Sequence, residues 1–274
     1  FISISSLIIN VIISIKILLD NLQSSLTNKI NIYNWLNIGI INNDYEIIYD
    51  KQNIVMINLI SIVTLIVVYY SFWYLDGDPH ITRFISYLLL FAFTMYLLVL
   101  SNNFILMFGG WECVGIMSYL LINYWSTSLN SNKSAFKAIL FNKLGDISYL
   151  FALILLYFLY NNFSISNLPS SSSWLIFLFF SFLLAALAKS AQFFFHCWLG
   201  DAMAGPTPVS ALLHAATMVT AGIFILLRIN PYFPYLNSNS VTNLLLFLGA
   251  LTIIFAGFSA IYQYDLKRII AFST

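Results

Sequence analysis

The stretch WLIFLFFSFLLAALAKSAQFFFHCWLGDAMAGPTPVSALLHAATMVTAGIFILLR, residues 174–228, decides the fold. Residues 174–188 are apolar apart from Ser181, and Lys189 follows them directly. As a helix rising about 1.5 Å per residue, this run reaches about 22 Å, so we expect Lys189 well inside a hydrocarbon core of about 30 Å. An ammonium there costs at least about 2.5 kcal/mol, so it persists only where it is paired, hydrated or used. The stretch therefore predicts a membrane protein with a proton pathway.

The composition of the whole chain also predicts a membrane protein. Its 274 residues are 61% hydrophobic and only 8% charged, whereas soluble domains carry about 25% charged residues. The formal net charge of +1 excludes a basic nucleic-acid binder and a strongly acidic tail. Cys113 and Cys197 show no CxxC spacing, so the sequence indicates neither a disulfide scaffold nor a metal site. It contains no Gly-rich phosphate loop or Rossmann fingerprint, so we expect nucleotide and redox chemistry on other polypeptides.

Hydrophobic segments divide the chain into eight expected membrane-spanning helices and the start of a ninth after Asp265. The expected spans are residues 1–19, 54–74, 84–100, 104–125, 133–160, 174–199, 208–228 and 241–262. Residues 20–53 are Asn-rich and charged, which predicts a connection outside the membrane. Gly and Pro within residues 200–208 predict a broken or re-entrant connection. Lys267 and Arg268 in the last loop predict an interfacial anchor.

Glu112 and Lys189 are the ionisable groups placed deepest in the expected spans. Glu112 lies eight residues into the fourth span, and its short side chain reaches an interface poorly, which favours a buried functional carboxylate over an interfacial one. About ten residues of the sixth span follow Lys189, so neither end of that span is close. A desolvated lysine loses proton affinity, and a nearby carboxylate restores it. A Glu112–Lys189 pair that can separate would therefore act as a proton-affinity switch.

Two histidines and a second charged pair are further candidates. His196 lies seven residues after Lys189, on the same face if the helix is continuous, and His214 lies early in the seventh span. Each histidine is either a polar residue bonded to a neighbouring helix or part of a proton relay, and both interpretations stay open. Lys143 and Asp146 are three residues apart and can pair along their own helix. That pair either stabilises a helix start or takes part in proton entry.

Several motifs resemble those of one known family. They are KSAQ at residues 189–192, DAM.GPTPVSALLHAATMVTAG at 201–222, GDPHITRFISYL at 77–88, LMFGGWECVGIMSYLLINYW at 106–125, KAILFNKLGDI at 137–147 and YDLKRIIAFST at 264–274. They are similar to motifs of the antiporter-like subunit 5 of NADH:ubiquinone oxidoreductase, respiratory complex I. The resemblance runs from about Tyr74 to Thr274, whereas residues 1–53 match loosely.

The resemblance implies an all-α polytopic membrane protein with about eight to nine transmembrane helices, at the distal end of a membrane arm and built from two inverted five-helix repeats. The first repeat would contain a broken helix, which carries His196. Residues 1–75 would hold N-terminal helices and a polar loop, residues 76–229 the first repeat with a proton half-channel, and residues 230–274 the start of the second repeat. The positions that match the family's input half-channel and central charged axis are Glu112, Lys189, His214, His196 and Asp146.

The resemblance also implies a function. The chain would be a proton-translocating membrane-arm subunit that couples NADH:ubiquinone electron transfer, carried out by other subunits, to pumping through a buried Glu–Lys–His axis. NADH, FMN, iron–sulfur clusters and ubiquinone are expected on other subunits, with no cofactor or metal on this chain. The expected partners are other membrane-arm subunits and lipids, without nucleic acid. The expected location is the mitochondrial inner membrane, with an organelle-encoded chain, rather than a bacterial plasma membrane.

The sequence departs from the family pattern at three points. Gly200 and Ala204 replace the Pro and Glu of WLP-DAMEGPTP, so that acid is not critical here or its charge is supplied elsewhere. The chain starts about one helix late and ends just inside the second repeat, from which we expect a split subunit completed by a second chain with the lateral helix, or else a fragment. Two other functions stay open: a cation/proton antiporter subunit of the Mrp type, and a structural membrane-arm subunit without pumping of its own.

Overall fold

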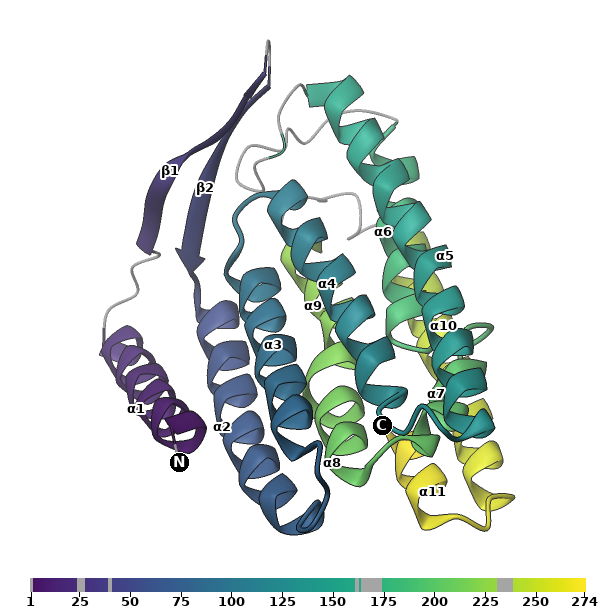
Figure 1. The fold of residues 1–274 in the computed structure, drawn as a ribbon. Helices are drawn as coiled ribbons and strands as arrows, with labels where there is room; N and C mark the ends of the chain where they lie inside the picture. The colour runs from purple at the N-terminus through teal and green to yellow at the C-terminus, as the bar shows by residue number, and fades with distance from the viewer. Residues whose placement is uncertain (1, 24–27, 39–40, 161–162, 164–173, 231–238) are drawn as a thin grey trace. The chain divides into compact units, whose positions relative to one another are not determined.

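The computed structural model describes residues 2–23, 28–38, 41–160, 163, 174–230 and 239–274 (Figure 1). The expected polytopic helical fold is confirmed, because seven helices within these ranges are long and apolar enough to cross a membrane. They are α1 (Ile2–Gln23), α2 (Lys51–Tyr74), α3 (Ile81–Leu100), α4 (Phe104–Ile122), α5 (Leu129–Tyr160), the span that ends in α9 (Met218–Ile229), and α10 (Asn239–Ile261). The apolar helix α6 (Leu175–Lys189) is shorter.

The chain forms two compact units, one of residues 1–121 and 161–166 and the other of residues 122–160 and 167–274. In the first unit, α2 packs against both α1 and α3 (Figure 1). Polar side chains connect α1 to α2: the hydroxyls of Ser14 and Ser61 lie 2.9 Å apart, and the Asn58 amide donates to the Ser14 carbonyl at 3.0 Å. Hydrogen bonds of this kind help to join helices in lipid, where burial of apolar surface supplies no driving force between them.

The connection between the first two helices contains a β-hairpin that the sequence analysis did not predict. Strands β1 (Asn28–Ile38) and β2 (Ile41–Tyr49) pair antiparallel. The Asn102 side chain donates to the Glu46 carboxylate, and the Asn102 backbone N–H donates to the Glu46 carbonyl at 3.1 Å. These bonds fix β2, through Glu46, to the turn between α3 and α4.

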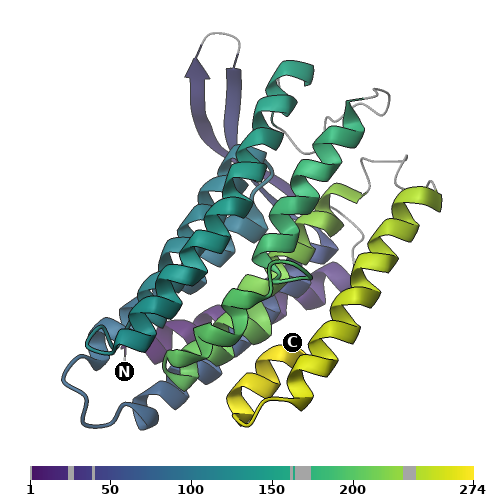
Figure 2. The same ribbon diagram turned by 90° about the vertical axis from the view of Figure 1, so that its right-hand side faces the viewer.

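The second unit is built around α6, which packs against both α5 and α9. Between α6 and α9 the chain forms α7 (Cys197–Asp201), the short 3₁₀ helix η2 (Ala202–Ala204), α8 (Thr207–Ser210) and a π-helical segment, η3 (Ala211–Thr217). After α10 the chain turns, and α11 (Leu266–Ser273) folds back against it (Figure 2).

The expectation of one continuous sixth span over residues 174–199 is wrong, because α6 ends at Lys189. The Gln192 N–H donates to the Leu187 carbonyl at 3.1 Å, and the Ala191 N–H donates to the Ala188 carbonyl at 3.4 Å. Ala191 has a φ of 51°. This is the Schellman pattern, in which a residue in the left-handed conformation stops a helix and its last carbonyls are satisfied locally. The chain after Lys189 therefore leaves the helix axis.

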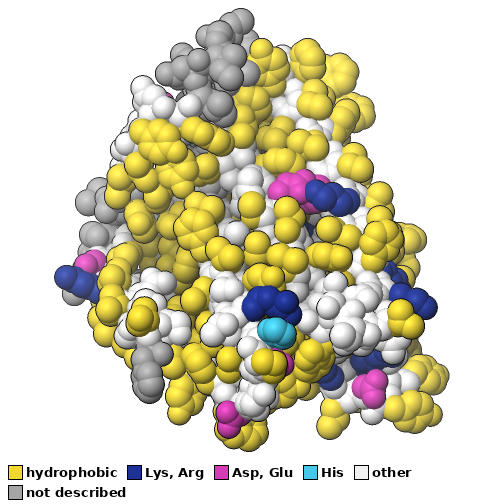
Figure 3. Space-filling view, in the orientation of Figure 1, with side chains coloured by type: hydrophobic (Ala, Val, Ile, Leu, Met, Phe, Trp, Pro, Cys, Tyr) yellow, Lys and Arg dark blue, Asp and Glu magenta, His cyan; other side chains and the backbone are white. Residues whose placement is uncertain are grey.

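The surface carries many apolar side chains. Hydrophobic side chains cover most of the face seen in Figure 3, and charged side chains form a few small groups on it. Large residues stand exposed along α5 and α10, among them Phe158 and Ile253. A soluble protein rarely exposes apolar surface on this scale, whereas helices in contact with lipid require it.

Two adjacent glycines of α4 give a test of helix packing in the first unit. A Cβ at Gly110 would lie 2.8 Å from the Leu98 backbone nitrogen on α3, whereas a Cβ at Gly109 would meet nothing within 4 Å. We expect Gly110→Ala to lower the free energy of unfolding by about 1–3 kcal/mol through overpacking. Gly109→Ala is expected to raise it by up to about 1 kcal/mol through helix propensity. Thermal unfolding of both variants in detergent measures the difference, and equal midpoints would contradict the close approach of α3 and α4.

Candidate functional site

Lys189 is the last residue of α6 and is only 1% exposed. Its burial follows from the apolar helix that leads into it. The C-terminal end of a helix carries a partial negative charge, which stabilises a cation by about 0.3–1 kcal/mol at exposed sites and up to about 2 kcal/mol in partly buried ones. The end of α6 therefore favours the ammonium form of the buried side chain.

Glycines on two neighbouring helices fix the end of α6. A Cβ at Gly222 on α9 would lie 2.6 Å from the Ala186 carbonyl oxygen and 3.1 Å from the Ser190 Cβ. A Cβ at Gly145 on α5 would lie 2.8 Å from the Ala188 Cβ. Small residues allow helix backbones to approach closely in membranes. Because both contacts fall within the last turn of α6 or just after it, they set the position of Lys189.

The predicted ion pair between Lys143 and Asp146 forms on α5, with 3.5 Å between the ammonium and the carboxylate. Its two members differ in exposure, because the Asp146 side chain is 3% exposed and the Lys143 side chain is 48% exposed. Asn142 is also buried, and its two amide atoms have no hydrogen-bond partner within the described ranges. Asn142 is not among the residues predicted from the sequence, although an asparagine within an apolar helix is a signal for a buried polar group.

His214 lies within the π-helical segment η3 and is 3% exposed. The Thr217 hydroxyl donates to the Leu212 carbonyl of the same segment at 2.6 Å. Neither ring nitrogen of His214 has a hydrogen-bond partner in the part of the chain that the structure describes. The ring instead lies against the indole of Trp198, with 5.9 Å between the ring centroids. π-Helical turns are rare and frequently occur at functional sites.

His196 does not continue the face of α6 on which Lys189 lies, because the chain leaves the helix axis at Ala191. The condition for the same-face arrangement, a continuous helix, is not met, and His196 follows a break as the family resemblance implies. His196 instead lines a cavity of about 490 Å³ together with Ser190 and Gln192. Ser190 follows Lys189 directly. The cavity therefore lies between His196 and the end of α6, although the two do not share a helix face.

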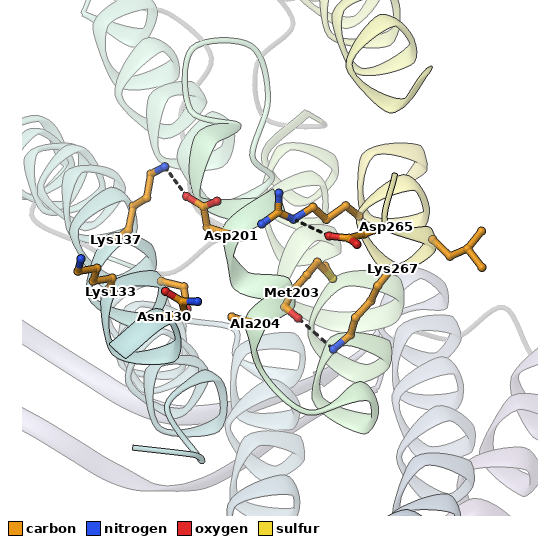
Figure 4. A pocket seen from close by; sticks show the side chains of 11 residues that line it. Asn130, Lys133, Lys137, Asp201, Met203, Ala204, Asp265 and Lys267 are labelled. Atoms are coloured by element: carbon orange, nitrogen blue, oxygen red, sulfur yellow. Dashed lines mark hydrogen bonds and ion pairs between the residues drawn. The ribbon is translucent and has the colours of Figure 1, made fainter. Parts of the chain in front are cut away.

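Two lysines hold the broken segment in place, at a charged pocket of about 720 Å³ (Figure 4). The Lys137 ammonium of α5 lies 2.6 Å from the Asp201 carboxylate. The Lys267 ammonium of α11 donates to the carbonyls of Met203 and Gly205 at 3.0 and 2.6 Å. Burial lowers the pKa of the Lys267 amine from its usual value. Lys267 thus has a more specific contact than the interfacial anchor expected from the sequence.

The two departures from the family motif fall within this segment. Ala204 stands between the two residues whose carbonyls accept from Lys267, so backbone oxygens bind the ammonium where the family pattern places an acid. A Cβ at Gly200 would lie 3.2 Å from the ring of Phe272 on α11. The small residue therefore leaves room for that ring.

Glu112 lies on α4 and is half-buried. It belongs to the first compact unit, whereas Lys143, Asp146, Lys189, His196 and His214 belong to the second. The pairing of Glu112 with Lys189 stays a prediction for that reason. Its role in proton transfer and the roles of the other five residues also stay predictions.

Two family models match the chain. Residues 101–274 match the model described as NADH:quinone oxidoreductase/Mrp antiporter, TM. Residues 35–85 match the model described as NADH-Ubiquinone oxidoreductase (complex I), chain 5 N-terminus. Together the two matched ranges contain most of the expected motifs.

Curated proteins and a solved structure are similar to the chain. NADH-ubiquinone oxidoreductase chain 5 of Dictyostelium citrinum is 46% identical over 255 residues, covering 88% of this chain and 38% of that protein. The protein of the same name from Allomyces macrogynus is 41% identical over 281 residues, covering 98% of this chain and 43% of that protein. The chain thus spans about two fifths of these relatives. A chain of the Mrp complex from Dietzia sp. gives a TM-score of 0.82 at 26% identity, covering 99% of this chain and 32% of that one.

The glycine contact beside Lys189 can be tested with a matched pair of variants. A Cβ at Gly222 would meet the Ala186 carbonyl at 2.6 Å, whereas a Cβ at Gly249 on α10 would meet nothing within 4 Å. We expect Gly222→Ala to lower the free energy of unfolding by about 1–3 kcal/mol, since a backbone oxygen cannot move aside alone. Gly249→Ala should not lower it. Unfolding midpoints in detergent give the comparison, and a Gly222→Ala protein as stable as the Gly249→Ala protein would rule out the close contact.

Proposed function

We propose that the chain is a proton-translocating membrane-arm subunit of respiratory complex I. The chain belongs to the NADH:quinone oxidoreductase/Mrp antiporter family of membrane subunits, and its residues 35–85 match the N-terminus of complex I chain 5. In this proposal NADH, FMN, iron–sulfur clusters and ubiquinone bind other subunits, and this chain supplies part of the proton path. The proposed partners are other membrane-arm subunits and lipids. The proposed location is the mitochondrial inner membrane.

The observation that carries the proposal is the burial of Lys189 at the end of a broken apolar helix. A lysine at such a depth is expensive unless it is paired or used, which makes an intramembrane lysine a functional candidate. The family resemblance alone suggests the fold and the general role of the chain. The burial of the Lys189 amine supports a specific chemistry for that amine. That chemistry is the binding and release of one proton.

The proposed transfer begins with the proton on Lys189, where the end of α6 favours the ammonium. We propose that Glu112 supplies the carboxylate that strengthens this preference in one state of the cycle. When the two separate, the lysine loses proton affinity because its charge is no longer compensated. His214 then accepts the proton, since its ring nitrogens have no hydrogen-bond partner among the described residues.

Lys143, Asp146 and His196 take the flanking parts of this path. The buried Asp146 carboxylate and the half-exposed Lys143 ammonium form a pair on α5 that extends from the protein interior toward the surface, which supports a role in proton entry. His196 and Ser190 line one cavity, which supports onward movement from the end of α6. Moving one charge against the membrane potential requires about 2.3 kcal/mol per 100 mV, so an external redox reaction must drive the cycle.

A cation/proton antiporter subunit of the Mrp type is the second candidate. The likeness to a chain of the Mrp complex from Dietzia sp. favours it, and the larger matching family model covers both groups. The greater identity to chain 5 relatives, 46% against 26%, favours complex I. Sodium-dependent exchange that proceeds without NADH, measured in vesicles that contain the assembled complex, would select the antiporter.

Replacing Lys189 tests the proposed function. Lys189→Met keeps much of the side-chain volume and removes the proton-binding amine, so we expect pumping to be abolished or uncoupled from electron transfer. The measurement is the number of protons moved per NADH oxidised by the assembled complex in proteoliposomes. Lys51→Met, at an exposed position where α2 begins, is the matched control and should pump normally. An unchanged proton stoichiometry in Lys189→Met would refute the role of the lysine and would favour a structural subunit.

A further inference from the structure

Trp198 is a fully buried residue of α7 that the proposed proton path does not use. Its place depends on the break after Lys189. The chain leaves the axis of α6 at Ala191 and returns through α7. The indole is thereby directed back to the helix end that the chain has just left. Trp198 and Lys189, nine positions apart in the sequence, are both among the largest fully buried side chains of the described residues.

The indole N–H of Trp198 donates to the Ala188 carbonyl at 3.2 Å. Ala188 directly precedes Lys189, and carbonyls in the last turn of a helix have no acceptor role within the helix. The Ala191 N–H satisfies the same carbonyl only at 3.4 Å, so the indole supplies the shorter bond. A fully buried tryptophan also needs an acceptor for its N–H. This bond therefore fixes α7 to the end of α6.

The ring of the same tryptophan lies against His214. The two ring centroids are 5.9 Å apart, with an angle of 44° between the ring planes. Within the described residues the imidazole makes no hydrogen bond, so ring packing rather than hydrogen bonding limits its orientation. One side chain thus contacts both the peptide unit that precedes Lys189 and the imidazole of His214.

We propose that Trp198 is a positioning residue that holds the Lys189 end of α6 and the His214 ring at a fixed separation for proton transfer. The inference rests on the proposed function of those two groups. Transfer between a donor and an acceptor depends steeply on their geometry, and a displacement of about 1 Å can cost about 100-fold in rate. Trp198 itself carries no proton in this scheme, because an indole N–H is a donor only.

The test uses the assembled complex in proteoliposomes and graded variants of Trp198. Trp198→Phe keeps a ring beside His214 and removes the bond to the Ala188 carbonyl, and Trp198→Leu removes both contacts. We expect Trp198→Phe to slow pumping about tenfold and Trp198→Leu to slow it further. Because proton transfer then limits turnover, the solvent deuterium isotope effect on pumping should rise in both variants.

Phe182→Leu is the matched control. Phe182 is also fully buried and packs edge-on against Tyr149 of α5, with 5.2 Å between ring centroids. The Phe182→Leu variant should lower the stability of the complex about as much as Trp198→Leu does. It should leave the solvent deuterium isotope effect on pumping unchanged. A purely structural role for Trp198 would make the two residues behave alike.

The outcomes separate the inference from the proposed function. If Trp198→Phe matches Phe182→Leu in pumping rate and isotope effect while Lys189→Met abolishes pumping, the positioning role is wrong and the proposed function stands. If Lys189→Met pumps normally, the proposed function fails, and the positioning role fails with it. A slowed Trp198→Phe complex with a raised isotope effect, beside an unaffected Phe182→Leu complex, supports both.

Discussion

The end of α6 at Lys189 is the constraint on which the second unit depends. A helix that stops inside an apolar stretch leaves carbonyls unsatisfied where lipid offers no donor. Here the N–H groups of Ala191 and Gln192 and the indole of Trp198 supply those donors. Because protein groups satisfy the break, it can persist within a stretch whose sequence is otherwise that of a membrane span. The ammonium of Lys189 is thereby placed at the negative end of the helix.

The segment after the break needs its own supports, because α7, η2 and α8 are too short to be stable alone. Lys137 binds Asp201 from α5, and Lys267 binds the carbonyls of Met203 and Gly205 from α11. These contacts join helices that are distant in sequence. They also explain how the segment tolerates Ala204, since the ammonium of Lys267 is satisfied by backbone oxygens. Backbone carbonyls of the segment thus bind the Lys267 ammonium, and no acid is needed at position 204.

Sequence reasoning predicted most of the fold, because long apolar runs identify spans directly. It also placed Lys189 in the interior and paired Lys143 with Asp146 from their spacing. It missed the end of α6, because Ala191 takes the left-handed position where a glycine would have signalled a stop. The β-hairpin was read as a polar connection, although Ile30, Asn31 and Ile32 alternate as strand residues do. Contacts such as that of Trp198 with Ala188 join a helix end to a later turn, and no local pattern encodes them.

The buried polar groups around the break differ in whether they have hydrogen-bond partners. The backbone groups at the break and the two lysines beside it have defined partners. His214 and Asn142 are equally buried, yet their polar atoms have none among the described residues. Each unsatisfied buried group costs about 1–3 kcal/mol. At His214 this cost fits the proposed proton transfer, in which the ring exchanges its hydrogen-bond partners.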